Sequence, residues 1–121
     1  MDTNQTSPLI SVLIVTWNSA AYLSRCLDCL AAQTCQDFEV VIVDNASSDD
    51  GVAGLDARYP GLTLSVHKMG ANLGFAVANN AGARLARGHW LVLLNPDAFP
   101  DPDWLAQLLR AAQEFPDYTF F

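Results

Sequence analysis

Acidic and amide side chains follow directly after two short apolar runs of this sequence. Asp44 and Asn45 come after the run FEVVIV. Asn95 and Asp97 come after the run WLVLL. Carboxylates are ligands of Mg²⁺ and Mn²⁺, which often take only one or two of them from a protein and the rest of their shell from water and substrate phosphates. If these side chains converge, they could hold a divalent cation and, through it, a diphosphate.

The same aspartates also have a purely structural interpretation. Asp and Asn favour turns and helix starts, because their short side chains bond to nearby backbone N–H groups. Asp97 could cap the turn after its apolar run, and Asp101 and Asp103 could begin the helix that follows. Spacing alone leaves both interpretations open.

Four strand-like runs alternate with four helical patterns, and these elements must position the polar residues. The predicted strands are 10–16, 38–43, 62–69 and 90–94, and the predicted helices are 20–33, 52–59, 75–87 and 104–115. The third run alternates apolar and polar residues, which favours a place near the sheet edge. We expect Asn18 and Ser19 to cap the first helix and Gly88 to end the third.

This alternation predicts an α/β, Rossmann-like fold with a mostly parallel four-stranded sheet and flanking helices. In such sheets ligands bind beyond the carboxyl ends of the strands. Polar residues follow the strands at 17–18, 44–45, 70–72 and 95–97. We therefore expect a binding site at that edge of the sheet.

Composition and charge exclude several classes of protein. A chain of 121 residues makes one domain, and its net charge of −7 argues against nucleic-acid binding, which needs a basic face. The apolar runs are far shorter than the roughly 20 residues of a transmembrane helix, and the first residues do not resemble a signal peptide. We expect a cytoplasmic protein, which could associate with a membrane through parts outside this chain.

The cysteines and histidines are expected to be structural. Cys26, Cys29 and Cys35 are an odd number, and they lie in or just after one predicted helix, which does not favour a disulfide framework. A zinc site at the C-x-x-C spacing would need about two more ligands, and His67 and His89 form no recognisable pair.

Four motifs in order resemble the nucleotide-sugar-binding half of the family 2 glycosyltransferases, especially their rhamnosyltransferase-like branch. The motifs are ISVLIVTWN, FEVVIVDNASSDDG, NLGFAVANNAG and WLVLLNPDA, and together they cover nearly the whole chain. The resemblance implies the first half of a GT-A fold. It also implies transfer of a sugar from a UDP, dTDP or GDP sugar to a saccharide or lipid-linked acceptor, in cell-wall or polysaccharide biosynthesis.

The resemblance further implies a set of binding residues. The nucleotide-sugar-binding residues would be Thr16, Asn18, Asp44, Asn45, Asn72, Gly74, Asn80, Asn95 and Asp97. Asp44 would be ionised and accept a hydrogen bond from the base, most naturally from N3–H of uracil or thymine. Asn80 stands where the family often has an arginine, so a cationic contact is missing there.

Asn95-Pro96-Asp97 aligns with the family's Asp-x-Asp motif, so Asp97 would bind Mg²⁺ or Mn²⁺ bridging the diphosphate. Asn95 keeps hydrogen-bonding ability but lacks a charge, which predicts weaker metal binding than two carboxylates would give. The Asn-Pro-Asp form is common in the rhamnosyltransferase-like branch.

The family's reaction is an inverting displacement, in which an acceptor hydroxyl attacks the anomeric carbon and the nucleoside diphosphate leaves. Its carboxylate general base lies beyond the Asp-x-Asp segment. The resemblance thus implies that residues 1–121 are a donor-binding part truncated at its C-terminus, with no catalytic residue and little activity alone. Residues 1–8 are expected to be flexible, and an exposed edge near Tyr118, Phe120 and Phe121 could pair with a second copy.

Two other functions remain open at this point. A non-catalytic α/β interaction domain would use the carboxylates only to cap turns. A dinucleotide-binding oxidoreductase module would need G-x-G-x-x-G after the first strand, where TWNSAA stands instead.

Overall fold

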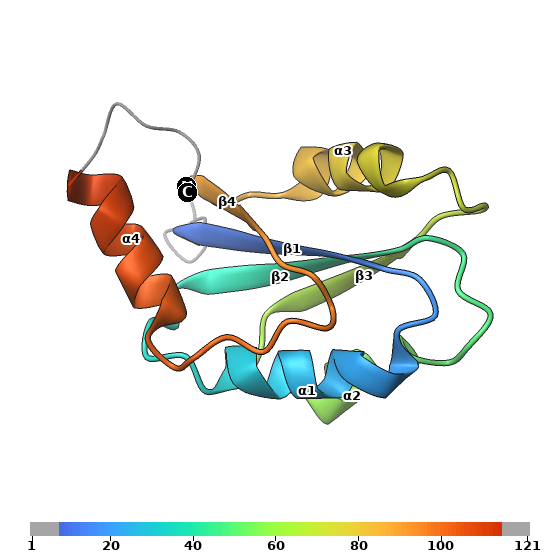
Figure 1. Ribbon diagram of the computed structural model, residues 1–121, viewed down its shortest axis with the longest axis horizontal. Helices are drawn as coiled ribbons and strands as arrows, with labels where there is room; N and C mark the ends of the chain where they lie inside the picture. The colour runs from blue at the N-terminus through green and yellow to red at the C-terminus, as the bar shows by residue number, and fades with distance from the viewer. Residues whose placement is uncertain (1–7, 115–121) are drawn as a thin grey trace, which may run out of the picture.

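The structure, a computed structural model, describes residues 8–114 and has a parallel sheet between two layers of helices (Figure 1). The strands are β1 (Ile10–Thr16), β2 (Phe38–Asp44), β3 (Leu64–Lys68) and β4 (Trp90–Leu93). The helices are α1 (Ala20–Ala31), α2 (Leu55–Arg58), α3 (Phe75–Leu85) and α4 (Trp104–Glu114). Both the α/β class and the predicted order of elements are confirmed.

The boundaries of some elements differ from those predicted. The second helix is a single turn rather than residues 52–59, because Gly54 adopts a left-handed conformation (φ 66°) directly before it. The third strand begins at Leu64, two residues later than expected. Predictions for residues 1–7, for Phe115 and for the late aromatics lie outside the described residues.

The sheet has the strand order β3-β2-β1-β4, and all its neighbouring strands are parallel. The alternating third strand lies at an edge, as predicted. β1 and β2 are central and buried along their whole length, because helices cover both faces. Strands covered on both faces need apolar side chains on both, which explains the nearly continuous apolar sequences of β1 and β2.

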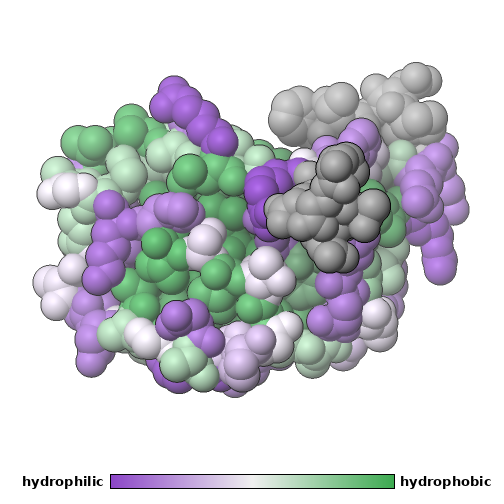
Figure 2. All heavy atoms as spheres, turned by 180° about the vertical axis from the view of Figure 1, so that it is seen from behind, coloured by the Kyte–Doolittle hydropathy of each residue, from purple (hydrophilic) through white to green (hydrophobic). Residues whose placement is uncertain are grey.

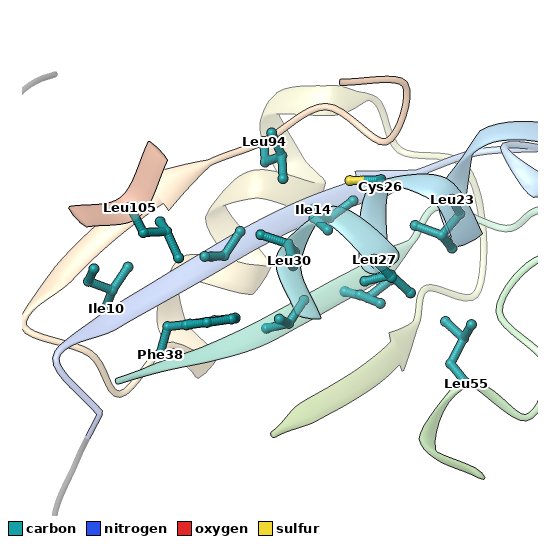
Figure 3. Packing of buried hydrophobic residues seen from close by; sticks show 13 residues of the cluster. Ile10, Ile14, Leu23, Cys26, Leu27, Leu30, Phe38, Leu55, Leu94 and Leu105 are labelled. Carbon is teal, nitrogen blue, oxygen red and sulfur yellow. The ribbon is translucent and has the colours of Figure 1, made fainter. Parts of the chain in front are cut away.

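One face of the sheet packs against α1 and α4 in the larger of two apolar clusters (Figure 3). The side chains labelled there include Ile10 and Ile14 from β1, Leu27 from α1 and Leu105 from α4. Helix α3 covers the other face, which includes Leu13 and Val43, as the upper layer in Figure 1. It approaches the sheet closely at Gly82, where an added Cβ would clash with a methyl carbon of Leu13.

β4 forms the other edge of the described sheet, although its apolar sequence looks like that of a central strand. Helix α3 packs over β1 and β2, so Leu91 and Leu93 remain 46% and 56% exposed on the same face. Their neighbours Trp90 and Val92 contact the larger cluster on the opposite face. Other apolar side chains (green) also reach the surface among polar ones (purple) on the side shown in Figure 2.

A buried carboxylate fastens the start of β4 to the centre of the sheet. Glu39, 5% exposed, accepts hydrogen bonds from Ser11 Oγ (2.6 Å) and from the Arg87 backbone N–H (2.7 Å), and the Arg87 guanidinium lies 3.3 Å away. Burial alone would raise the pKa of Glu39. The hydrogen bonds from Ser11 and Arg87, with the charge of Arg87, outweigh burial and lower that pKa.

Gly88 has a different role from the one predicted. The third helix already ends at Leu85, and Ala86 is extended, so Gly88 does not terminate it. Gly88 lies instead against β1, where an added Cβ would be 2.5 Å from the backbone nitrogen of Ser11 and 2.7 Å from the carbonyl carbon of Ile10. Its N–H donates to Ser11 Oγ at 2.7 Å. Glycine is therefore needed for close backbone approach.

Candidate functional site

The loops that follow β1, β2 and β3 lie together on the side of the sheet formed by the carboxyl ends of its strands, on the right in Figure 1. Thr16 at the end of β1 is in register with Asp44 at the end of β2, and Asp44 with Lys68 of β3. β4 ends earlier, with Leu93 opposite Leu13, and the chain then turns back. The parallel arrangement thus gathers the residues after the first three strands.

Asp44 is almost completely buried at the end of β2, with 4% of its surface exposed. Its Oδ1 accepts a hydrogen bond from Ser47 Oγ at 2.5 Å, and its Oδ2 accepts one from the Ser47 backbone N–H at 3.2 Å. A carboxylate group can accept more hydrogen bonds than these two, which both come from Ser47. Thr16, which lies beside it on β1, is also buried.

Asn18 joins the loop after β1 to the loop after β2. It has a left-handed backbone (φ 49°), and its Oδ1 accepts hydrogen bonds from the N–H groups of Ser48 (2.7 Å) and Asp49 (3.3 Å). Ser19 does occupy the N-cap position of α1, and its carbonyl accepts the Leu23 N–H at 3.0 Å, but neither its side chain nor that of Asn18 caps the helix. The carboxylate of Asp49 accepts from the Ala20 N–H at 3.1 Å instead, from a loop about 30 residues along the chain.

The side chain of Asn45 forms hydrogen bonds with other residues of the protein. Its Nδ2 donates to Asn72 Oδ1 (3.0 Å) and to the Gly74 carbonyl (3.3 Å), and its Oδ1 accepts from the Leu73 N–H (3.2 Å). The buried amide thus holds the loop after β3 against the end of β2. Its contacts indicate that Asn45 shapes the site rather than offering free groups to a ligand.

The Asn-x-Gly segment forms the entry to α3. Asn72 is exposed, and its Oδ1 also accepts from the Gly74 N–H at 3.0 Å. Gly74 has φ 93° and ψ 165°, a conformation that side chains other than glycine rarely adopt. Asn80 lies exposed on α3 itself.

Asn95 and Asp97 are both exposed in the turn after β4. The turn is closed by a hydrogen bond from the Ala98 N–H to the Asn95 carbonyl at 3.0 Å. Within residues 8–114, no donor is bonded to the Asp97 carboxylate, so turn capping does not account for this side chain. Asp103, in contrast, directly precedes α4 and accepts the Gln107 N–H through its backbone carbonyl at 2.9 Å, as a helix start requires.

Cys26 of α1 lies beneath this turn, within the apolar cluster (Figure 3). Its thiol donates to the Asn95 carbonyl at 3.8 Å. Burial raises the pKa of Cys26 to about 12, with smaller contributions from Cys29 and Asp97, so the thiol stays protonated near neutral pH. All three cysteines are free thiols.

Gln33 lies just after α1 and holds the chain in place around the start of α4. Its Nε2 donates to the Asp101 carbonyl (2.7 Å), and its Oε1 accepts from the Leu105 N–H (3.0 Å). The Arg25 guanidinium also lies 4.2 Å from the centre of the Phe99 ring. Sequence patterns gave no signal for these contacts, because the partners lie about 70 residues apart.

The few possible metal ligands in the turn after β4 suit a cation that binds together with a phosphate group. Residues 8–114 contain no group of three or more His, Cys, Asp and Glu side chains able to form a preformed metal cage. Asp97 and Asn95 provide one carboxylate and one amide, and Mg²⁺ commonly completes such a set with water and substrate phosphates. Asp44 lies two strands away from β4, or about 10 Å at the usual strand spacing.

Comparison with known families identifies the chain. A family model described as glycosyl transferase family 2 matches residues 11–120. This chain belongs to that family. The resemblance drawn from the four motifs is thus confirmed.

A curated relative from Mycobacterium tuberculosis is named a PGL/p-HBAD biosynthesis glycosyltransferase. It is 40% identical over 105 residues, which are 84% of this chain and 41% of the relative. The chain therefore spans about two fifths of that protein's length.

Two solved glycosyltransferase structures share the architecture. S. aureus TarS 1–349 in complex with UDP superposes with a TM-score of 0.81 at 27% identity, over 89% of this chain and 33% of TarS. The mannosyltransferase PcManGT from Pyrobaculum calidifontis, in complex with GDP-Man and Mn²⁺, gives a TM-score of 0.81 at 31% identity, over the same shares. The chain shares the architecture of the corresponding third of these GT-A enzymes.

None of the helices within residues 8–114 combines the length and apolar character needed to cross a bilayer.

Proposed function

We propose that this chain is the donor-binding part of an inverting glycosyltransferase and binds a nucleoside-diphosphate sugar at the carboxyl ends of its strands. The observation that carries the proposal is that one carboxylate follows β2 and another follows β4. Asp44 is buried with acceptor positions to spare, and Asp97 is exposed with no donor bonded to it in the described part of the chain.

The donor would lie across the end of β1, between these two aspartates. Asp44 would accept a hydrogen bond from the base, and the diphosphate would extend from the end of β2 across β1 toward Asp97, a width of about 10 Å at the usual strand spacing. Thr16, Asn18 and Asn45 would shape the nucleoside side of this site. Asn72, Gly74 and Asn80 would border it from the entry to α3, without the cation that an arginine at position 80 would supply.

Asp97, assisted by Asn95, would hold Mg²⁺ or Mn²⁺ against the diphosphate. The bound cation would supply Lewis-acid stabilisation of the departing diphosphate. The presence of Mn²⁺ with GDP-Man in the PcManGT structure supports this assignment. Because Asn95 is uncharged, we expect the cation to bind weakly without nucleotide.

The acceptor would be a saccharide or a lipid-linked compound, and its hydroxyl would attack the anomeric carbon. The general base that removes its proton is expected outside residues 1–121, so this chain alone would bind the donor but transfer sugar poorly.

Titration calorimetry with UDP, dTDP and GDP, each with and without Mn²⁺, tests the proposal. We expect one nucleotide to bind in a Mn²⁺-dependent manner and Asp97→Asn to weaken that binding by about tenfold or more, as loss of a carboxylate ligand does. Asp56→Asn, on exposed α2, is the matched control and should bind normally. Unchanged Mn²⁺ dependence in Asp97→Asn would refute the metal role, and absence of binding even with the downstream sequence attached would favour a non-catalytic interaction domain.

A further inference from the structure

We infer that Ser47 is a positioning residue that orients the Asp44 carboxylate and thereby sets how strongly the site recognises a base carrying an N3–H group. The inference rests on the proposed function, in which Asp44 accepts that hydrogen bond. It concerns a residue that the family resemblance left without a role.

Ser47 bonds to both oxygens of the carboxylate. Its Oγ donates to Asp44 Oδ1 at 2.5 Å, and its backbone N–H donates to Oδ2 at 3.2 Å. Two donors from one residue restrain rotation about the bond that carries the carboxylate group. Hydrogen bonds to an ionised acceptor are also stronger than those between neutral groups.

The direction of the Ser47 hydrogen bond is determined by a third residue. Ser47 Oγ accepts a hydrogen bond from the Asn18 backbone N–H at 2.8 Å. An N–H group can only donate, so the single hydroxyl proton of Ser47 is free to point toward Asp44. The series Asn18 N–H, Ser47 O–H and Asp44 Oδ1 is therefore polarised toward the carboxylate.

The backbone around Asp44 is held independently of Ser47. The Asp44 carbonyl accepts the Met69 N–H at 2.8 Å, and the residue is paired with Thr16 and Lys68 on the neighbouring strands. Loss of the Ser47 hydroxyl should therefore change the orientation of the carboxylate while leaving the strand in place. This separates a positioning role from a general structural one.

The neighbouring Ser48 provides a matched control. It is exposed, and both its N–H (2.7 Å) and its Oγ (3.1 Å) donate to Asn18 Oδ1. It thus belongs to the same loop and has the same side chain. Its hydroxyl is bonded to Asn18 rather than to the carboxylate of Asp44.

The test compares the binding of UDP and N3-methyl-UDP, both with Mn²⁺, to the wild-type chain, Ser47→Ala, Ser47→Thr and Ser48→Ala. Wild type should prefer UDP by about tenfold or more, the value of one hydrogen bond to a charged group. Ser47→Ala should lose most of this preference by weakening UDP binding alone, whereas Ser47→Thr and Ser48→Ala should retain it. Circular dichroism establishes that each variant is folded.

Two results would overturn the inference and can be told apart. If wild type prefers UDP and Ser47→Ala keeps the full preference, or weakens both ligands equally, Ser47 does not orient Asp44. If wild type binds both nucleotides equally or neither, the proposed role of Asp44 is itself wrong, and the inference fails with it.

Discussion

Replacing Gly88 with alanine is expected to destabilise the chain strongly, although the change adds one methyl group. The new Cβ would lie 2.5 Å from the Ser11 backbone nitrogen, 2.6 Å from Ser11 Oγ and 2.7 Å from the Ile10 carbonyl carbon. Two of these atoms belong to the backbone of central strand β1, which cannot move aside as the end of a flexible side chain can. The start of β4 must therefore shift away from β1.

The expected decrease in the free energy of unfolding is the sum of two contributions. Overpacking of this kind costs about 1–3 kcal/mol, and the broken hydrogen bond from the Gly88 N–H to Ser11 Oγ costs about 1 kcal/mol more. The sum of about 2–4 kcal/mol is a large part of the roughly 5–15 kcal/mol that stabilises a domain. At about 4 °C per kcal/mol for a chain of this size, the midpoint of thermal unfolding should fall by about 8–16 °C.

Urea and thermal unfolding followed by circular dichroism measure this effect. The matched control is Gly61→Ala, because an added Cβ at Gly61 meets no atom within 4 Å. It removes the same backbone freedom from the unfolded chain, so the difference between the two variants isolates the steric cost. A free energy of unfolding for Gly88→Ala within about 0.5 kcal/mol of that for Gly61→Ala would refute the reasoning.

Three further predictions concern single side chains. Asn95→Asp should lower the Mn²⁺ concentration needed for nucleotide binding, because it adds a second carboxylate; an unchanged or higher requirement would contradict this. Glu39→Gln should reduce the free energy of unfolding at pH 7, and this reduction should shrink as the pH falls from 4.5 through the lowered pKa of Glu39, because the carboxylate stabilises the fold above its unfolded pKa of 4.5 and no longer does so below its folded pKa; a reduction that stays the same from pH 7 into acid would argue against it. Cys26, whose pKa is raised to about 12, should resist iodoacetamide at pH 8 until urea unfolds the chain, and stability should fall as the pH rises above 9.0; mass spectrometry showing equally fast labelling without urea would count against this.

The sequence predicted much of the fold because its signals are local. Four strand-like runs and the helical patterns between them indicated the elements, and their alternation indicated a parallel sheet. The carboxyl ends of parallel strands all lie on the same side of the sheet. The position of Asp44 on that side, next to the other polar residues that follow strands, could therefore be predicted without coordinates. The alternation within β3 likewise indicated an edge strand.

Sequence patterns did not reveal how the loops at that edge bond to one another. Residues Asn18 and Ser48 are 30 positions apart, and Asn45 is a similar distance from Asn72. Composition marked these residues only as turn formers or ligand candidates, because Asn and Ser serve both purposes. The packing decided that Asn45 holds a loop, that Asp49 caps α1 and that Ser47 contacts Asp44.

The early end of β4 and the tight contact at Gly88 show the same limit. The apolar sequence of β4 suited a central strand, and only the placement of α3 over β1 and β2 left Leu91 and Leu93 exposed. The sequence by itself therefore determined which elements form and which of their ends carry polar groups, since both depend on neighbouring residues. The tertiary structure decided which polar atoms are used internally, because that depends on the register of strands and on contacts between residues about 30 to 80 positions apart.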